Sequence, residues 1–454
     1  MKLKLGFTLR CAVLCSASTL SFPAISADAA MMELLKVLRE KGAISESDYQ
    51  QLQNAAESET AANKKEIENQ VTEATKDIPV VKTGSSGLKI ESKDGDFKFQ
   101  VGGRLMVDVA SYDTDETKLG SGAEIRRARL FAKGTVYKDW LYKAQVDFAG
   151  DDTALKDVYL GYTGFKPVKI IFGNHKEPFS LEELTSSKYI TFMERGLPNA
   201  FSPGRNVGLS ASTHGESWGA SAGYFFDGVE NDSSPKNQGW GATGRVHFAP
   251  LNSDSSVVHL GMAASYRGAD GDNEVRFRER PESHVTSTRL VNTGTLTSYD
   301  NQTLLGAEAA AVFGPFSLQG EYIQTSVDLD GPGSDPDFNG WYVYGSYFLT
   351  GEHRPYKVSN GTFGRVKPDS IVGKGGHGAW ELAARYSTID LDDSGIEGGE
   401  EDNITLCLNW YATPNIRFMV NYIHASTDPT SVVQYPTARD EDVDLFQLRG
   451  QVDF

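Results

Sequence analysis

Three arginines at alternate positions, in the run Arg276-Phe-Arg-Glu-Arg280, form a chemically distinctive pattern. In an extended backbone, residues two apart point the same way and lie about 6.5–7 Å apart. An anion leaving one of the guanidinium groups of Arg276, Arg278 and Arg280 would therefore be within reach of the next. Cationic donors in series, none binding too tightly, are what an anion-conducting pore requires. A solvated basic stretch in a long loop is the alternative interpretation.

A second basic group follows strand periodicity. One predicted strand face carries Arg127, Arg129, Phe131 and Lys133, and the opposite face carries Ala128, Leu130 and Ala132. Lipid disfavours an arginine near the membrane midplane by about 2–4 kcal/mol. If this strand crosses a membrane, Arg127 and Arg129 are therefore expected to face a lumen. Arg126 is expected to point the other way unless it lies at the strand end.

The strand type that must position these charges is clearest in the last thirteen residues. One face is apolar and the other polar, with Phe446, Leu448, Gly450, Val452 and Phe454 opposite Gln447, Arg449, Gln451 and Asp453. Such a strand is about long enough to span a bilayer when tilted. Its aromatic end resembles the sorting signal of bacterial outer-membrane barrels. A strand of a soluble sandwich could show the same alternation.

Similar segments recur from about residue 88, roughly sixteen in all, with aromatic residues near the ends of their apolar faces. Clear examples are residues 258–266, 341–349, 380–386, 404–410 and 416–422. Tight connections (137–139, 163–167, 313–315 and 412–415) contrast with longer acidic ones (113–124, 227–238, 328–337 and 390–403). The pattern predicts an all-β fold, a transmembrane antiparallel β-barrel of about sixteen strands. Sixteen strands enclose a water-filled lumen.

Composition agrees with export and with a barrel. The 454 residues contain no apolar run of 18 or more, which argues against a transmembrane helix but not against a barrel. Lys2, Lys4 and Arg10 precede an apolar run and small residues, which predicts a signal peptide over residues 1–27. Cys407 is the single cysteine after it, which excludes a disulfide within the mature chain. The net charge of −17 does not fix the sign of the field inside a cleft.

Residues 28–79 are predicted to form a helical or coiled-coil periplasmic segment ahead of the barrel at 80–454. Leu34, Leu35 and Leu38 form a helical stripe that ends at Gly42, and Ser45-Glu-Ser-Asp48 resembles a capping box that opens a second helix. The sequence leaves two roles open for this segment. It is a stalk or wall-contacting segment, or it is a solvated spacer.

Several runs resemble the phosphate-selective porin O and P family. They are residues 97–104, 126–129 with 134–140, 162–165 with 172–173, 185–188 with 194–195, 349–357, 409–412 and the terminal strand. The resemblance covers about residues 80–454, in order. It implies a trimer of sixteen-stranded barrels whose pore is narrowed by inward-folded segments. It also implies that cationic side chains line the pore and conduct anions.

The resemblance assigns roles to particular residues. It places Arg276, Arg278 and Arg280 in an arginine ladder on the fifth outer loop. It places Arg104, Lys188 and Arg195 in the pore or in its constricting segment, residues 174–206, and it folds the connection with Arg354, Lys357 and Lys367 inward. In an ungapped match, two positions depart from the family: Glu183 stands where it has a lysine, and Lys156 where it has an aspartate. Either this pair is charge-reversed or the match slips across the loop. These departures predict anion conduction with only weak block of chloride current by phosphate.

The sequence therefore predicts a passive outer-membrane anion channel of a Gram-negative bacterium, exported through the periplasm and homotrimeric. Its partners would be phosphate, polyphosphate and chloride, with lipid and lipopolysaccharide outside. Two alternatives keep the fold: a structural or adhesive barrel and a general non-selective porin. Gly215-Glu-Ser-Trp-Gly219 fits a hydrolase pattern, but that pattern needs a strand feeding a helix, and a hairpin turn is expected here. No catalytic, cofactor, metal or nucleic-acid motif is found.

Overall fold

The computed structural model describes residues 24–74, 78–150, 153–229, 237–269, 271–330, 335–428 and 440–454. The chain divides into two compact units, Met1–Ile78 and Pro79–Phe454. Most of the predicted signal peptide, residues 1–23, lies outside the described residues.

The first unit contains two helices, α1 (Ala24–Glu40) and α2 (Glu46–Ala74). Gly42 follows the end of α1 and has a φ of +68°. Glycine adopts this left-handed backbone conformation at little cost. Ser45 caps α2, because its Oγ accepts the N–H of Asp48 at 3.2 Å and donates to the Asp48 carboxylate at 2.6 Å. The two predicted helices and the capping residues are confirmed. Neither helix is long and apolar enough to cross a membrane.

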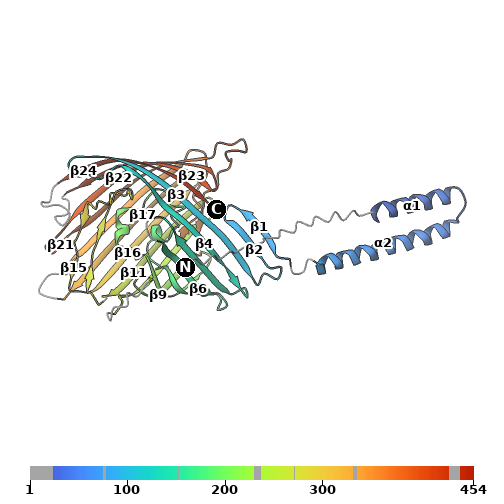
Figure 1. The fold of residues 1–454 in the computed structure, drawn as a ribbon, viewed down its shortest axis with the longest axis horizontal. Coiled ribbons are helices and arrows are strands. Elements are labelled where there is room, and N and C mark those ends of the chain that lie inside the picture. Colours follow the sequence, from blue (N-terminus) through green and yellow to red (C-terminus); the bar gives the residue numbers. More distant parts are fainter. Residues whose placement is uncertain are drawn as a thin grey trace, which may run out of the picture. The chain divides into compact units, whose positions relative to one another are not determined.

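The second unit is a closed barrel of sixteen antiparallel strands (Figure 1). In chain order they are β3 (Lys98–Thr114), β4 (Gly122–Val136), β5 (Trp140–Asp147), β6 (Ala154–Tyr162), β7 (Lys169–Lys176), β8 (Arg205–His214), β9 (Trp218–Phe226), β10 (Trp240–Asn252), β11 (Ser256–Gly268), β16 (Tyr299–Phe313), β17 (Phe316–Leu329), β18 (Asp337–Phe348), β21 (Ala379–Asp393), β22 (Ile396–Thr413), β23 (Ile416–Thr427) and β24 (Glu441–Asp453). Each strand pairs with the next, and β24 pairs with β3 to close the ring. The predicted fold class and strand number are confirmed.

The second unit also contains short elements that are not among the sixteen barrel strands. A hairpin of β1 (Val80–Gly84) and β2 (Gly87–Glu91) pairs with β3 through Leu88 and Val101. The remaining elements lie in connections, namely α3 (Leu181–Leu184), η1 (Leu197–Phe201), β12 (Glu274–Val275), β13 (Arg278–Glu279), β14 (Val291–Asn292), β15 (Leu296–Thr297), β19 (Tyr356–Lys357) and β20 (Thr362–Phe363).

Burial in the barrel is the reverse of that in a soluble sheet. On β24, Phe446 and Leu448 are 60% and 53% exposed, whereas Gln447 and Arg449 are 1% and 2% exposed. The apolar faces therefore point outward and the polar faces inward, as in a strand that crosses a bilayer. Aromatic side chains meet on the outer surface, where Trp410 stacks between Trp380 and Phe418 with ring centroids 5.5 Å from each. These pairs match the aromatic girdle that the sequence predicts.

The connections confirm one prediction and correct another. The Gly215 N–H donates to the Trp218 carbonyl at 2.9 Å, so residues 215–217 are the hairpin turn expected between β8 and β9. The long acidic loop predicted at 390–403 is wrong, because β21 and β22 pair through it as far as Asp393 and Ile396. The turn itself is Ser394-Gly395, and both residues have positive φ. Such a turn matches the twist of paired strands, and the acidic residues lie along the hairpin instead of interrupting it.

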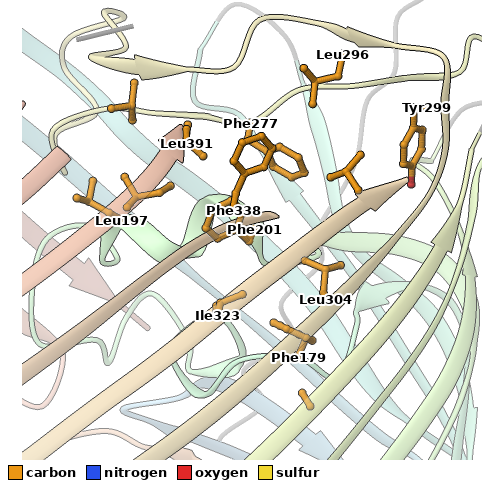
Figure 2. Close-up of a cluster of buried hydrophobic side chains, with 14 residues drawn as sticks. Phe179, Leu197, Phe201, Phe277, Leu296, Tyr299, Leu304, Ile323, Phe338 and Leu391 are labelled. Atoms are coloured by element: carbon orange, nitrogen blue, oxygen red, sulfur yellow. The ribbon is translucent and has the colours of Figure 1, made fainter. Parts of the chain in front are cut away.

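Inside the barrel, a hydrophobic cluster holds two long connections against the wall formed by β16–β21 (Figure 2). Phe179, Leu197 and Phe201 come from residues 177–204, and Phe277 comes from residues 269–298. Phe277 lies between Phe201 and Phe338, with ring centroids 5.5 and 5.6 Å away. The packing fixes both connections against this part of the ring.

Candidate functional site

The connection between β7 and β8 crosses the interior of the barrel. Strands β21–β24 lie five to eight strands from β7 in the sixteen-strand ring, yet their side chains bind the backbone of this connection. The Arg417 guanidinium donates to the Ile190 and Thr191 carbonyls at 2.7 and 2.6 Å, and Arg385 donates to the Glu194 carbonyl at 3.1 Å. These contacts place residues 177–204, here called the constricting segment, inside the lumen. The sequence predicted such a segment over 174–206.

Glu194 is the main ionic anchor of the constricting segment. Arg449 of β24 contacts its carboxylate at 2.6 Å, and Arg126 of β4 binds both its oxygens at 2.8 and 2.9 Å. Arg127 lies 3.6 Å away. Burial would raise the pKa of Glu194, but Arg126, Arg127 and Arg449 outweigh it and hold that pKa well below its usual range. Glu194 therefore stays ionised and ties the segment to β4 and β24.

The expected outward direction of Arg126 is wrong. In the β3–β4 pairing, Met106 faces Arg127 and Val107 faces Ile125, so Arg126 is an extra residue in a bulge. A bulge re-aims side chains and breaks the period of two, and Arg126 turns inward to Glu194. Arg127 and Arg129 face inward as predicted, since Arg127 is buried and Arg129 pairs with Asp147 at 2.6 Å, while Leu130 is 48% exposed.

A cationic cluster occupies the lumen between the constricting segment and strands β3–β8. Its members are Arg104, Arg129, Lys143, Lys156, Lys176, Arg195 and Arg205, interspersed with Asp147, Asp157 and Glu183. Seven cations surround three carboxylates, so the cluster carries four more positive charges than negative. Arg104 donates to the Ser187 hydroxyl at 2.6 Å, and it forms no ion pair within the described part of the chain.

Glu183 is neutralised inside this cluster. Its two carboxylate oxygens lie 2.9 Å from the Lys176 Nζ and 3.1 Å from an Arg195 guanidinium nitrogen. Burial would raise the pKa of Glu183, but the charges of Arg195 and Lys176 lower it to about 2. Glu183, which stands where the family has a lysine, is therefore surrounded by residues whose net charge is positive.

The aspartate that faces the cations is Asp157, not the residue at position 156. In the β5–β6 pairing, Ala144 faces Val158 and Val146 faces Leu155, so Lys156 and Asp157 together oppose one residue. This second bulge brings neighbouring side chains to the same, inward side. Asp157 binds the Arg205 Nε at 2.7 Å and also contacts Lys143. Lys156 forms no ion pair within the described residues.

The predicted arginine ladder lies in the connection between β11 and β16, residues 269–298. Arg276 and Arg278 are exposed on either side of the buried Phe277, and the Arg276 Nε donates to Asn292 at 2.8 Å. Arg280 is half-buried beside a cavity of about 160 Å³ that Glu194 also lines. Arg289 is a fourth arginine near the three, within electrostatic range of each.

The connection between β18 and β21, residues 349–378, also folds inward. The Arg354 guanidinium lies 3.8 Å above the Phe363 ring and donates to Gln319 of β17 at 3.2 Å, whereas Lys357 and Lys367 are exposed. Nearby, Lys188 pairs with Asp453 at 3.2 Å. Among the described residues, neither Arg354 nor Lys357 forms an ion pair with the acids of the cluster around Arg205.

Several residues of the cluster escaped the sequence analysis. Lys143 lies on an inward strand position that the period of two identifies. Lys176 does not, because it shares the parity of Phe172, which is 63% exposed on the outer face. Arg205 is the first residue of β8 and pairs with Lys176 across the strands. Its partner Asp157 is hidden by the bulge. Within the described residues, no group of three or more His, Cys, Asp or Glu side chains is arranged to hold a metal ion.

Comparisons with known proteins bear on the family and the fold. The family model described as phosphate-selective porin O and P matches residues 99–454. Porin O of Pseudomonas aeruginosa is 30% identical over 415 residues, which are 83% of this chain and 92% of that protein. An uncharacterized protein of Caulobacter vibrioides is 31% identical over 343 residues, 72% of this chain and 68% of that protein. Among solved structures, OmpT of Vibrio cholerae aligns with a TM-score of 0.50 at 15% identity, covering 79% of this chain and 98% of that one.

Proposed function

Because the chain belongs to the phosphate-selective porin O and P family, we propose that it is a passive channel for inorganic anions, with phosphate or polyphosphate among them. Family and fold identify an outer-membrane porin, and they point to a channel instead of an enzyme.

The cationic cluster is the observation that carries the proposal. We infer that it lies where the constricting segment narrows the lumen, on the path of a permeating ion. Its excess of four positive charges opposes the formal charge of −17 of the whole chain. The local field inside a narrow lumen decides which ions enter. Arg104 and Lys156 contribute most directly, because neither is paired with a carboxylate among the described residues.

The arginines of residues 269–298 extend the cationic path toward the long-loop end of the barrel. Arg276 and Arg278 are exposed, so each can contact a hydrated anion. Fixed guanidinium groups replace part of the hydration shell, and several weak sites in series let the ion move on. We assign the first contacts to this loop and the narrowest passage to the cluster at Arg205.

Phosphate is included among the permeating anions because the charge of Glu183 is neutralised. As a lone carboxylate it would repel a multivalent anion more than chloride. Paired with Lys176 and Arg195, it leaves the cluster positive. Asp157 can also accept a hydrogen bond from a protonated phosphate oxygen, although Arg205 and Lys143 already occupy much of its carboxylate.

Planar-bilayer recording tests the proposal. In a potassium chloride gradient, the reversal potential of the purified porin should favour chloride, and added phosphate should reduce the chloride current in a saturable way. A preference for potassium would refute anion selectivity. Chloride preference without any phosphate block would leave a general anion porin. Negligible conductance, with loss of attachment or envelope integrity on deletion, would favour a structural or adhesive barrel.

We also propose that the barrel assembles as a homotrimer, as the family resemblance implies, and that α1 and α2 form a periplasmic unit. Exposed apolar residues on the helices, including Leu34, Leu52 and Val71, could pack against other copies. Light scattering of the detergent-solubilised protein, with and without residues 28–79, measures both the copy number and the contribution of the helices.

A further inference from the structure

A second basic pocket lies in the lumen, nearer the end of the barrel with short turns. Its volume is about 140 Å³, and β7–β10 form its wall. Ser359 and Asn360 of the inward-folded connection 349–378 and Pro178 of the constricting segment close its other sides. None of the described residues that line this pocket carries a carboxylate. The pocket therefore differs from the cluster at Arg205, where three acids share the space.

Strand register builds a row of donors along its wall. Lys169 pairs with Ser212, Ser212 with Ser221, and Ser221 with Arg245. Neighbouring strands are about 4.8 Å apart, so an ammonium, two hydroxyls and a guanidinium follow one another across four strands. Side chains directly opposite one another in a ladder point to the same face, and here that face is the lumen.

Lys169 is the unusual member of this row. Arg245 is paired with Glu308 and donates to the Gly361 carbonyl at 2.8 Å. Lys169 is only partly exposed, and it forms no ion pair within the described part of the chain. A partly desolvated ammonium without a counter-charge is costly, so a bound anion would stabilise it. Serine hydroxyls can donate further hydrogen bonds to that anion.

We propose that Lys169, Ser212 and Ser221 form a binding subsite for tetrahedral oxyanions, separate from the Arg205 cluster. The inference rests on the proposed anion channel and adds a station on its periplasmic side. Lys176 lines the pocket and also belongs to the cluster, so the two sites are adjacent. Because no carboxylate among the lining residues accepts a phosphate O–H, the subsite binds sulfate and phosphate alike.

The test compares block of chloride current by sulfate and by phosphate, each added from the periplasmic side of a planar bilayer. Lys169→Gln should weaken block by both anions about tenfold, the size expected for losing a charge-assisted hydrogen bond. Lys169→Arg should stay close to the unmodified porin. The double variant Ser212→Ala/Ser221→Ala should weaken both blocks by a smaller factor. Lys65→Gln, on the exposed surface of α2, is the matched control.

The outcomes separate the subsite from the channel proposal. Unchanged block in Lys169→Gln would overturn the subsite, even if reversal potentials still favour chloride. Weakened block by phosphate alone would overturn the proposed lack of discrimination. If the unmodified porin prefers potassium, the channel proposal fails, and the same titrations on the potassium current still decide whether Lys169 binds oxyanions. Heat-modifiable migration on gels shows that each variant barrel is folded.

Discussion

Replacing Glu183 with glutamine should tighten phosphate block. The carboxylate neutralises Lys176 and Arg195 from 2.9 and 3.1 Å, and its loss raises the positive excess of the cluster from four charges to five. Glutamine has nearly the same shape and keeps a carbonyl oxygen that accepts hydrogen bonds. The perturbation is therefore mainly electrostatic.

The magnitude follows from Coulomb's law. For an anion roughly 7 Å from the new charge, the interaction is about 2 kcal/mol at an effective dielectric of 20 and about 0.6 kcal/mol in bulk water. An intermediate value of about 1 kcal/mol per unit of anion charge corresponds to about fivefold in affinity for chloride and about thirtyfold for a phosphate dianion. Phosphate must displace chloride, so the block of chloride current by the dianion should tighten by about fivefold, which is the ratio of the two gains in affinity.

The assay is a phosphate titration of the chloride current at about pH 8, with Glu216→Gln as control. Glu216 is an exposed acid in the turn 215–217, so its neutralisation changes the net charge but not the constriction. Equal block in Glu183→Gln and the unmodified porin would show that permeating anions do not pass the cluster. Weaker block would show that Glu183 acts mainly by positioning Lys176 and Arg195 for anion binding. Its compensation of their positive charge would then be the smaller effect.

Acid adds a second test of the same pair. The pKa of Glu183 is lowered from 4.5 to about 2, with burial opposing the shift and Arg195 and Lys176 producing it. Its ionised form therefore stabilises the fold above about pH 4.5, and this stabilisation is lost as the pH falls toward 2. The difference in reversal potential between Glu183→Gln and the unmodified porin should persist at about pH 3.5. Its disappearance near pH 4.5 would mean that the ion pairs do not form.

Two further predictions concern the loops. Replacing Arg276, Arg278 and Arg280 together with alanine should lower chloride preference far more than neutralising three exposed acids of the β21–β22 hairpin, because these guanidinium groups are assigned the first contacts with an entering anion. Unchanged reversal potentials would place that loop outside the conduction path. Arg417→Met removes two hydrogen bonds to the constricting segment, so thermal unfolding should report about 2–4 kcal/mol lower stability and single-channel conductance should rise. If the Arg417→Met barrel is less stable but conducts as well as the unmodified porin, the constricting segment keeps its place without this anchor.

Much of the barrel was predictable because its signal is local. With lipid outside the barrel and water inside, apolar and polar side chains alternate along each strand with a period of two. The alternation of Phe446 and Leu448 with Gln447 and Arg449 is an example. Each short turn marks a reversal. The same logic gave the inward direction of Arg127 and Arg129. It also indicates Lys143 and Lys169, although their significance depends on neighbours that sequence does not place.

The rest depends on shifts of register and on contacts between distant residues. A bulge inserts one residue without changing composition, so Arg126 and Asp157 turn inward against the expected parity. The pairing of Glu194 with Arg449 joins residues 255 positions apart. A loop of 28 residues between β7 and β8 could set Glu183 against several cations, and the choice of Lys176 and Arg195 emerges only when the constricting segment is packed.

Selectivity of the cluster is measured most directly by the reversal potential in a potassium chloride gradient, recorded for the unmodified porin and for the double variant Arg104→Gln/Lys156→Gln. Neither cation is paired with a carboxylate among the described residues, so the double variant leaves no acid newly unpaired. The unmodified porin should prefer chloride, and the double variant should lose much of that preference, while the control Lys64→Gln/Lys65→Gln on exposed α2 should not. A preference for potassium in the unmodified porin, or an unchanged potential in the Arg104→Gln/Lys156→Gln variant, would contradict the assignment of anion selectivity to this cluster.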